Sequence, residues 1–198
     1  MKKLDPQDLL DIAAYEKVRE ERLDAVIALK KHRRVAVGPL VTLVFENRET
    51  IRSQIQEMMR AERLVQDEAI QAELDVYNEL LPGAGELAAT LYIEVDDPGH
   101  VRPVLDRFIG LDETGRLVMG FTGGARAPAV FESGHSREDR ISAVQFVKFS
   151  LDETAARALA SGNGVVTIEI DHPQYRAAGE IPPEVRRSLA SDLEPERG

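Results

Sequence analysis

Three arginines and a glutamine recur along one face of a segment that the sequence predicts to be helical. They stand four, four and three residues apart and are Arg52, Gln56, Arg60 and Arg63. Guanidinium groups at this spacing can bind a carboxylate or a phosphate through paired hydrogen bonds. The commoner arrangement is a solvated helix face on which such groups pair with nearby acids. We therefore treat these four residues as a candidate binding site for a small anion.

Two glutamates of the same segment are candidate acids or bases for an enzymatic reaction. Glu57 lies beside the arginines, and Glu62 falls within an apolar stripe, between Met58 and Val65. A carboxylate in such a stripe must either reach solvent or be buried, and burial demands a partner or a raised pKa. A structural ion pair is the more usual reason for an acid at such a position.

His172 is a third candidate acid or base, because it follows the end of a predicted strand, where functional side chains often gather. The simpler interpretation is that Asp171 and His172 form a turn before Pro173. We favour this simpler interpretation.

Other motifs with known chemistry are absent or out of place. Residues 83–88 match G-x-G-x-x-A, but they follow a helix and enter a strand, the reverse of the order in a dinucleotide site. Glu132 and His135 have the E-x-x-H spacing of metal ligands on a helix, but Gly134 between them disfavours a helix. We therefore expect no metal site, and the sequence leaves any cofactor unknown.

The composition narrows the classes of function. The chain has 198 residues, no cysteine and a formal net charge of −10. Absence of cysteine excludes disulfides and cysteine nucleophiles and is typical of a reducing compartment, so we expect a cytoplasmic protein. The negative charge argues against nucleic acid as a partner. Since no run of about 18 apolar residues occurs, we expect no membrane span either.

One long helix must position most of the candidate residues. Residues 50–81 contain no glycine or proline, so the sequence predicts a strand followed by a single helix within residues 34–82. The second half of this helix carries five acids and no base, which indicates that its two halves meet different surroundings. The acids are Asp67, Glu68, Glu73, Asp75 and Glu79. Residues 1–33 are expected to be mostly helical.

The rest of the chain predicts a sheet. Two strand–helix–strand units are expected within residues 86–170, and a short helix is expected over residues 182–193. This pattern favours one α+β domain over residues 1–198, with a mixed or antiparallel sheet, helices on one face and two units of ferredoxin-like character. Between the units, residues 122–140 are rich in glycine, alanine, serine and charge, so we expect a mobile loop or a long hairpin there.

Several segments together resemble a bacterial family of about this length that is classified only as a domain of unknown function. They are residues 34–39 (Arg-Val-Ala-Val-Gly-Pro), 41–46, 54–63, 74–78, 142–146, 171–173 and 188–190. The resemblance covers nearly the whole chain. The resemblance implies that the gene lies beside genes for rubrerythrin-like proteins and iron–sulfur oxidoreductases. It therefore implies an accessory role in redox chemistry or in defence against oxidative stress.

Two hypotheses of function follow. The leading one is a non-enzymatic interaction protein that docks onto a redox partner, a rubrerythrin-like protein or an iron–sulfur oxidoreductase, through the long helix and residues 122–140. The alternative is an enzyme or a binding protein for a small anionic molecule. In that case the three arginines hold the anion, and the two glutamates or the histidine act as acid or base.

Overall fold

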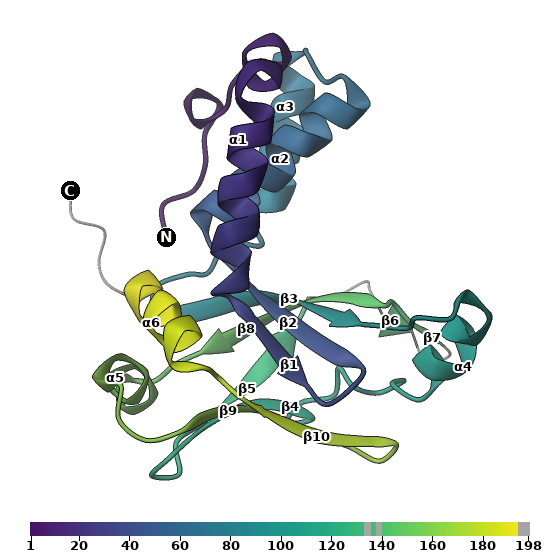
Figure 1. The fold of residues 1–198 in the computed structure, drawn as a ribbon, viewed down its shortest axis with the longest axis vertical. Coiled ribbons are helices and arrows are strands. Elements are labelled where there is room, and N and C mark those ends of the chain that lie inside the picture. The colour runs from purple at the N-terminus through teal and green to yellow at the C-terminus, as the bar shows by residue number, and fades with distance from the viewer. Residues whose placement is uncertain (133–135, 138–139, 194–198) are drawn as a thin grey trace.

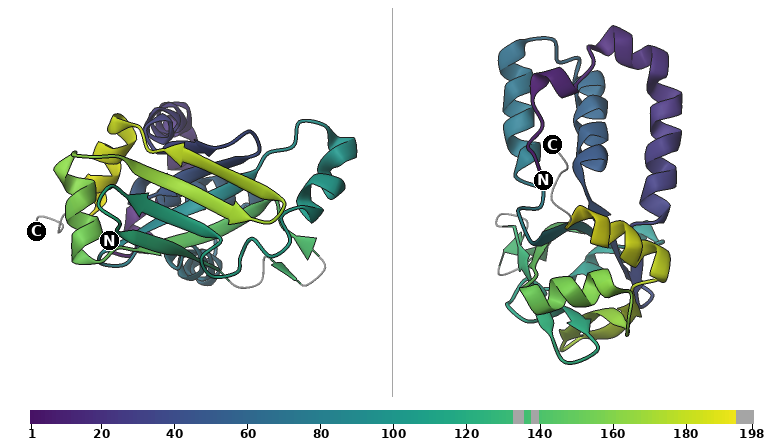
Figure 2. Two further views of the ribbon diagram at one scale, coloured as in Figure 1. Left: turned by 90° about the horizontal axis from the view of Figure 1, so that it is seen from below. Right: turned by 90° about the vertical axis from the view of Figure 1, so that its left-hand side faces the viewer.

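The computed structural model describes residues 1–132, 136–137 and 140–193. Over these residues the chain has six α-helices and an eight-stranded antiparallel sheet that curls into a nearly closed barrel. Three helices form a stalk that projects from the barrel (Figure 1). They are α1 (Ile12–Lys31), α2 (Arg48–Glu62) and α3 (Asp67–Asn78). The N-terminal residues, with the short helix η1 (Pro6–Asp8), run along this stalk (Figure 2).

The strands of the barrel follow one another in an order that differs from their order in the chain. From one end of the sheet to the other they are β1 (Arg34–Val37), β2 (Val41–Glu46), β3 (Glu86–Ile93), β8 (Val144–Ser150), β5 (Arg126–Phe131), β4 (Leu117–Phe121), β9 (Val166–His172) and β10 (Tyr175–Glu180). Two short strands, β6 (Ser136–Arg137) and β7 (Arg140–Ile141), pair separately. Residues 40–45 are apolar on both faces in the sequence, which predicts a central strand. Strand β2 is one, since it lies between β1 and β3 and all six of its residues are buried.

The barrel nearly closes because the two outermost strands, β1 and β10, lie against each other. Gly179 permits this approach, since a Cβ atom there would lie 2.0 Å from the carbonyl oxygen of Ala36. The Tyr175 hydroxyl donates a hydrogen bond to the carbonyl oxygen of Val37 at 2.6 Å and accepts one from the Leu40 amide at 3.2 Å. These contacts hold the end of the sheet against its beginning.

Alternate residues of the strands fill the barrel with apolar side chains, and helices cover its two ends. Figure 2 shows α5 (Glu153–Ser161) and α6 (Pro183–Asp192) at one end, with α4 (Val101–Asp106) and the 3₁₀ turn η2 (Pro98–His100) at the other. Leu159 of α5 and Leu189 of α6 pack into the core. The buried Arg186 donates to the carbonyl oxygens of Leu159 at 2.9 Å and Gly164 at 2.7 Å, where the end of α5 lacks helical partners.

The prediction of one continuous helix over residues 50–81 is wrong. Helix α2 ends at Glu62, and Arg63 adopts the left-handed conformation, with φ of 55°. The amide of Leu64 then bonds to the carbonyl oxygen of Met59 at 2.9 Å, which closes the helix end. Helix α3 folds back beside α2 (Figure 2), so that apolar residues of both share a core. Burial of that core outweighs the helical propensity of the connecting residues.

The α+β class and the antiparallel sheet are confirmed, whereas ferredoxin-like units do not appear among the described residues. A ferredoxin-like unit has two parallel strands with one strand between them. Here two strands lie between β3 and β4, and two between β8 and β9, and every neighbouring pair is antiparallel, so the strands that flank each predicted helix run in opposite directions. The helices lie in the stalk and at the barrel ends instead of on one face (Figure 1). The expected loop over residues 122–140 includes β5, a strand of the barrel. His135 of the E-x-x-H motif lies in the same segment but outside the described residues.

Candidate functional site

A groove of about 720 Å³ lies in the stalk between the N-terminal segment and α3. We call it the stalk groove. Its apolar lining comes from Pro6, Leu9, Leu10, Met59, Ile70 and Ala72. Its acidic lining comes from Asp11, Asp67, Glu68 and Asp75, and Gln71 completes the wall. No lysine, arginine or histidine is among these lining residues, all of which lie in the described part of the chain.

Two amide side chains fix the N-terminal wall of the stalk groove. Gln56 of α2 bonds to both backbone groups of Leu10, with distances of 2.7 Å to the amide and 3.0 Å to the carbonyl oxygen. Asn78 of α3 does the same with Leu4, at 2.8 and 2.9 Å. An otherwise irregular segment is thereby held against two helices with its backbone groups satisfied.

The acids of the stalk groove also have local structural roles. Asp11 caps α1 by accepting a hydrogen bond from the Ala14 amide at 2.8 Å. Asp67 and Glu68 stand in the first turn of α3, where the helix dipole favours negative charge. Asp75 accepts from Gln71 at 2.8 Å. All four acids are exposed, so their negative potential acts on anything that enters the groove.

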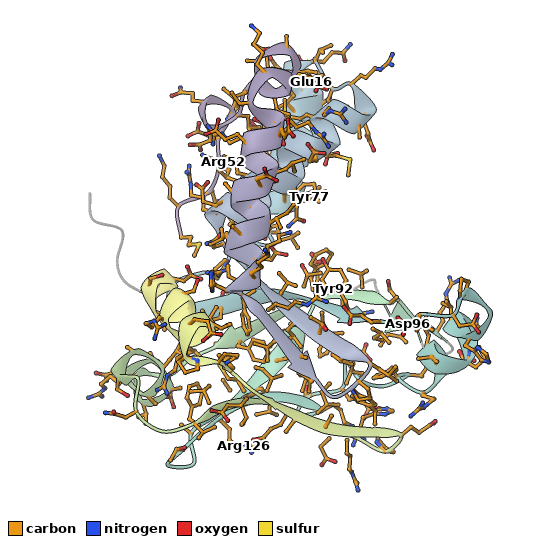
Figure 3. The ribbon with its side chains drawn as sticks, viewed as in Figure 1. Glu16, Arg52, Tyr77, Tyr92, Asp96 and Arg126 are labelled. Carbon is orange, nitrogen blue, oxygen red and sulfur yellow. The ribbon has the colours of Figure 1, made fainter. Side chains whose placement is uncertain are left out.

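The structure places the predicted anion-binding residues in the stalk, mostly bonded within the chain. Arg52 pairs with Glu49, and Arg60 pairs with Glu16 at 2.6 Å. Figure 3 shows Glu16 toward the free end of the stalk and Arg52 further down, toward the barrel. Gln56 is only 5% exposed and serves Leu10, as described above. Arg63 is exposed at the end of α2. These four residues do not converge on one hollow, although Arg52 and Gln56 line a small one together.

Glu57 is held by Arg19 and Tyr15 of α1. The Arg19 guanidinium donates to Glu57 twice, and the Tyr15 hydroxyl donates at 2.8 Å. The hydrogen bond from Arg19 lowers the pKa of the Glu57 carboxyl, with Tyr15 contributing in the same direction. Burial, followed by the bond to Glu57, raises the pKa of Tyr15 to about 12. A carboxylate held ionised in this way joins two helices.

The other two acid–base candidates lie apart from this cluster. Glu62 is the last residue of α2 and is exposed. Of the two alternatives for a carboxylate at this position, it therefore reaches solvent and is not buried. Its expected apolar stripe ends with the helix, and Val65 beyond it is 74% exposed. His172 is 4% exposed, and its Nε2 bonds to the carbonyl oxygen of Ile109, just after α4. It ends strand β9, which lies in the barrel and not in the stalk (Figure 1).

His172 has a structural role in the β9–β10 hairpin. Its Nδ1 accepts a hydrogen bond from the Gln174 amide at 3.3 Å, which leaves Nε2 to donate to the carbonyl oxygen of Ile109 at 2.9 Å. The simpler interpretation places Asp171 and His172 in a turn before Pro173, but both belong to strand β9, and the turn is formed by Pro173 and Gln174. The histidine thus ties the hairpin to the segment that follows α4.

The sequence does not predict the stalk groove. The run of acids in residues 64–81 indicates only that this segment meets other surroundings than residues 50–63, and the segment is the separate helix α3, which forms one wall of the groove. The opposite wall comes from residues 6–11, which are about 60 positions away in the chain. Leu9 and Leu10 read in the sequence as ordinary helix positions, so nothing local indicates that they line a groove.

Comparison with known proteins places the chain in a family without assigning it a reaction. A family described as "Protein of unknown function (DUF3501)" matches residues 3–193. The fold is similar to a crystal structure described as a novel protein of unknown function from Burkholderia pseudomallei K96243. That protein is 37% identical, with a TM-score of 0.90 over 98% of this chain and 100% of the other. The search of curated proteins gives no match.

Proposed function

Since the chain belongs to this family of proteins of unknown function, we propose that it is a non-enzymatic accessory protein that binds a partner protein through the stalk groove. The observation that carries the proposal is the lining of that groove, which combines apolar side chains with four acids and no base. A partner segment that presents lysines or arginines together with apolar side chains fits this lining. Grooves of this kind commonly receive an amphipathic segment of another chain.

Electrostatics strengthen the fit. The four exposed carboxylates repel one another, and a basic segment relieves that repulsion when it binds. The net charge of −10 also attracts a basic partner from a distance and speeds its encounter. A volume of about 720 Å³ accommodates several side chains of such a segment. The apolar floor supplies the contact that screening by salt does not remove.

We propose a cytoplasmic redox protein as the partner, either a rubrerythrin-like protein or an iron–sulfur oxidoreductase. The family resemblance supports this choice. With no cysteine, the chain has no thiolate to hold an iron–sulfur cluster, so its contribution would be binding and not electron transfer through such a cluster. An anion site on the stalk has less support, because Arg52, Arg60 and Glu57 each bond to a residue of the same chain.

The test is charge reversal in the tagged, full-length chain, expressed in the bacterium that encodes it. One variant carries Asp67→Lys, Glu68→Lys and Asp75→Lys in the stalk groove. Its matched control carries Asp96→Lys, Asp112→Lys and Glu184→Lys, three exposed acids outside the stalk, and so has the same net charge. Recovery of rubrerythrin-like or iron–sulfur oxidoreductase proteins is quantified by mass spectrometry. Circular dichroism establishes that both variants fold.

We expect the groove variant to lose the redox partner by about tenfold or more and the control to retain it. If both variants recover equally less of the partner, overall charge and not the stalk groove determines binding, which contradicts the proposal. Recovery of the partner undiminished by the groove variant, or recovery of no redox partner by the wild-type chain, would contradict the proposal.

A further inference from the structure

A second hollow, of about 240 Å³, lies where the stalk meets the outer face of the barrel. We call it the base pocket. The outer face of the sheet forms its floor, and Leu80, just beyond the end of α3, contributes to its wall. Phe146 and Val130 add further apolar surface. The base pocket shares no lining residue with the stalk groove, so the two can bind independently of each other.

The register of the sheet places an acid and a base on opposite sides of an alanine in this pocket. Glu46 of β2 pairs with Ala88 of β3, and Ala88 pairs in turn with Lys148 of β8. Neighbouring strands are about 4.8 Å apart, so the α-carbons of Glu46 and Lys148 are separated by about 10 Å. The methyl group of Ala88 is all that stands between the two longer side chains on this row. The row is therefore hollow at its centre and oppositely charged at its two sides.

Glu46 is a buried carboxylate whose partners are neutral. It is 2% exposed and accepts hydrogen bonds from the Thr90 hydroxyl at 2.6 Å and the Gln54 amide group at 3.2 Å. Within the described part of the chain no lysine, arginine or histidine forms an ion pair with it. Burial of a carboxylate without a cation is costly, so a cationic group that reached Glu46 would be bound favourably.

Lys148 has the complementary property. It is half-buried, and it forms no hydrogen bond or ion pair with a described residue. Its acidic neighbours in the lining are Glu79, which pairs with Lys3 at 3.0 Å, and Glu132. The hydrogen bond from Lys3 is the largest cause that lowers the pKa of Glu79, and the charge of Lys148 lowers it further. Because Lys148 lines a half-buried hollow, a charged hydrogen bond from it to an anion is stronger than in open water.

From this arrangement we infer that the base pocket binds a small zwitterion with an apolar body, the chemistry of an apolar amino acid. The ligand's ammonium group bonds to Glu46 and its carboxylate to Lys148, while its side chain packs against Leu80 and Phe146. A volume of 240 Å³ is that of about eight water molecules, which suits a ligand of similar heavy-atom count, such as valine or leucine. No bond is made or broken in this binding.

The experiment is isothermal titration calorimetry of the full-length chain with L-leucine and L-valine. Isovalerate and isobutylamine, which each lack one of the two charges, are titrated in parallel. Three variants test the pocket. Lys148→Met removes the positive charge, Glu46→Gln removes the carboxylate, and Ala88→Val fills the hollow while both charges remain. Lys17→Met, on an exposed position of α1, is the matched control for Lys148→Met.

We expect saturable binding of L-leucine or L-valine, a loss of about tenfold or more in affinity in each pocket variant, and no change in Lys17→Met. The single-charge probes should bind at least about tenfold more weakly. If Glu46→Gln fails to fold, Lys148→Met and Ala88→Val still decide the question. Absence of saturable binding by both amino acids, binding that survives these two variants, or equal binding of isovalerate would overturn the inference.

Discussion

Arg19 binds both carboxylate oxygens of Glu57, with Nε 2.8 Å from Oε1 and Nη2 2.7 Å from Oε2. The contact joins α1 to α2 in the stalk. Tyr15, which donates to the same carboxylate, is the one residue of α1 that is buried. Because α1 buries so little apolar surface, the stalk depends on this polar contact more than a typical helical bundle does.

Replacement of Glu57 by alanine should lower the free energy of unfolding by about 1 kcal/mol, because Arg19 and Tyr15 lose their shared acceptor. Urea denaturation measures the change, and hydrogen exchange should show that α1 opens more readily. Glu20, an exposed acid on α1, provides the control: Glu20→Ala should change neither the free energy of unfolding nor the hydrogen exchange of α1. Unaltered exchange in α1 of Glu57→Ala would contradict this role.

Acid should destabilise the protein partly through Glu57. The hydrogen bond from Arg19 lowers the pKa of this carboxyl below its ordinary value of 4.5 in the folded state. Its contribution is therefore complete above the ordinary value and is lost as the pH falls through the folded pKa. Urea denaturation between about pH 6 and pH 3 should show a shallower decline in Glu57→Gln than in the wild type. Parallel declines would mean that other carboxyls account for the acid sensitivity.

High pH should destabilise the protein partly through Tyr15, whose pKa is raised from 10.0 to about 12 by burial and by Glu57. A group of this kind contributes fully to stability below its ordinary pKa and loses that contribution as the pH rises through the folded value. Near-ultraviolet titration of wild type and Tyr15→Phe gives the Tyr15 curve by difference. We predict a midpoint near 12 while circular dichroism remains native, and a midpoint near 10 would show that neither burial nor Glu57 raises the pKa of Tyr15.

Two adjacent arginines should differ sharply in their effect on stability. Arg33 is 1% exposed, donates to the carbonyl oxygen of Phe45 at 2.7 Å and pairs with the buried Asp192 of α6. Arg33→Met should cost about 3 to 5 kcal/mol, because Asp192 is left buried without its partner. Arg34→Met should cost less than about 1 kcal/mol, because the pair of Arg34 with Glu94 is exposed. Thermal and urea unfolding compare the two, and equal costs would contradict the burial argument.

Strands β1 and β10 meet at the seam of the barrel, and their close approach requires Gly179. Alanine there places Cβ 2.0 Å from the Ala36 carbonyl oxygen, so β10 must move away from β1 at a cost of about 3 kcal/mol. Gly99→Ala is the matched control, since its Cβ would come no closer than 3.3 Å to an exposed side chain. If the two variants unfold at the same urea concentration, the seam does not depend on Gly179.

The sequence predicts the elements of this fold better than their arrangement. Apolar residues on both faces of 40–45 correctly indicate a central strand, because that pattern is local. The break after Glu62 is not visible, since Arg63 adopts a left-handed conformation that a glycine would ordinarily mark. Barrel closure is equally hidden, because it depends on Gly179 meeting Ala36, which is more than 140 residues away.

The candidate sites show the same limit. Charge spacing on residues 52–63 indicates an anion site, but acids from other elements, Glu16 among them, take up part of that charge. Arg33 appears in the sequence within a basic cluster at a helix end, yet it turns into the protein to meet Asp192. Both outcomes are decided by residues far away in the chain, so spacing alone does not predict them.

The central claim, that the stalk groove receives a redox partner, is tested most directly by photo-crosslinking in living cells. A photoreactive amino acid replaces Gln71, on the groove wall, or Asp112, an exposed residue outside the stalk. We predict that position 71 crosslinks to a rubrerythrin-like protein or an iron–sulfur oxidoreductase, through a peptide that carries lysine or arginine beside apolar residues. Position 112 should not crosslink to it. Crosslinks of that partner at position 112 and none at position 71 would contradict the account.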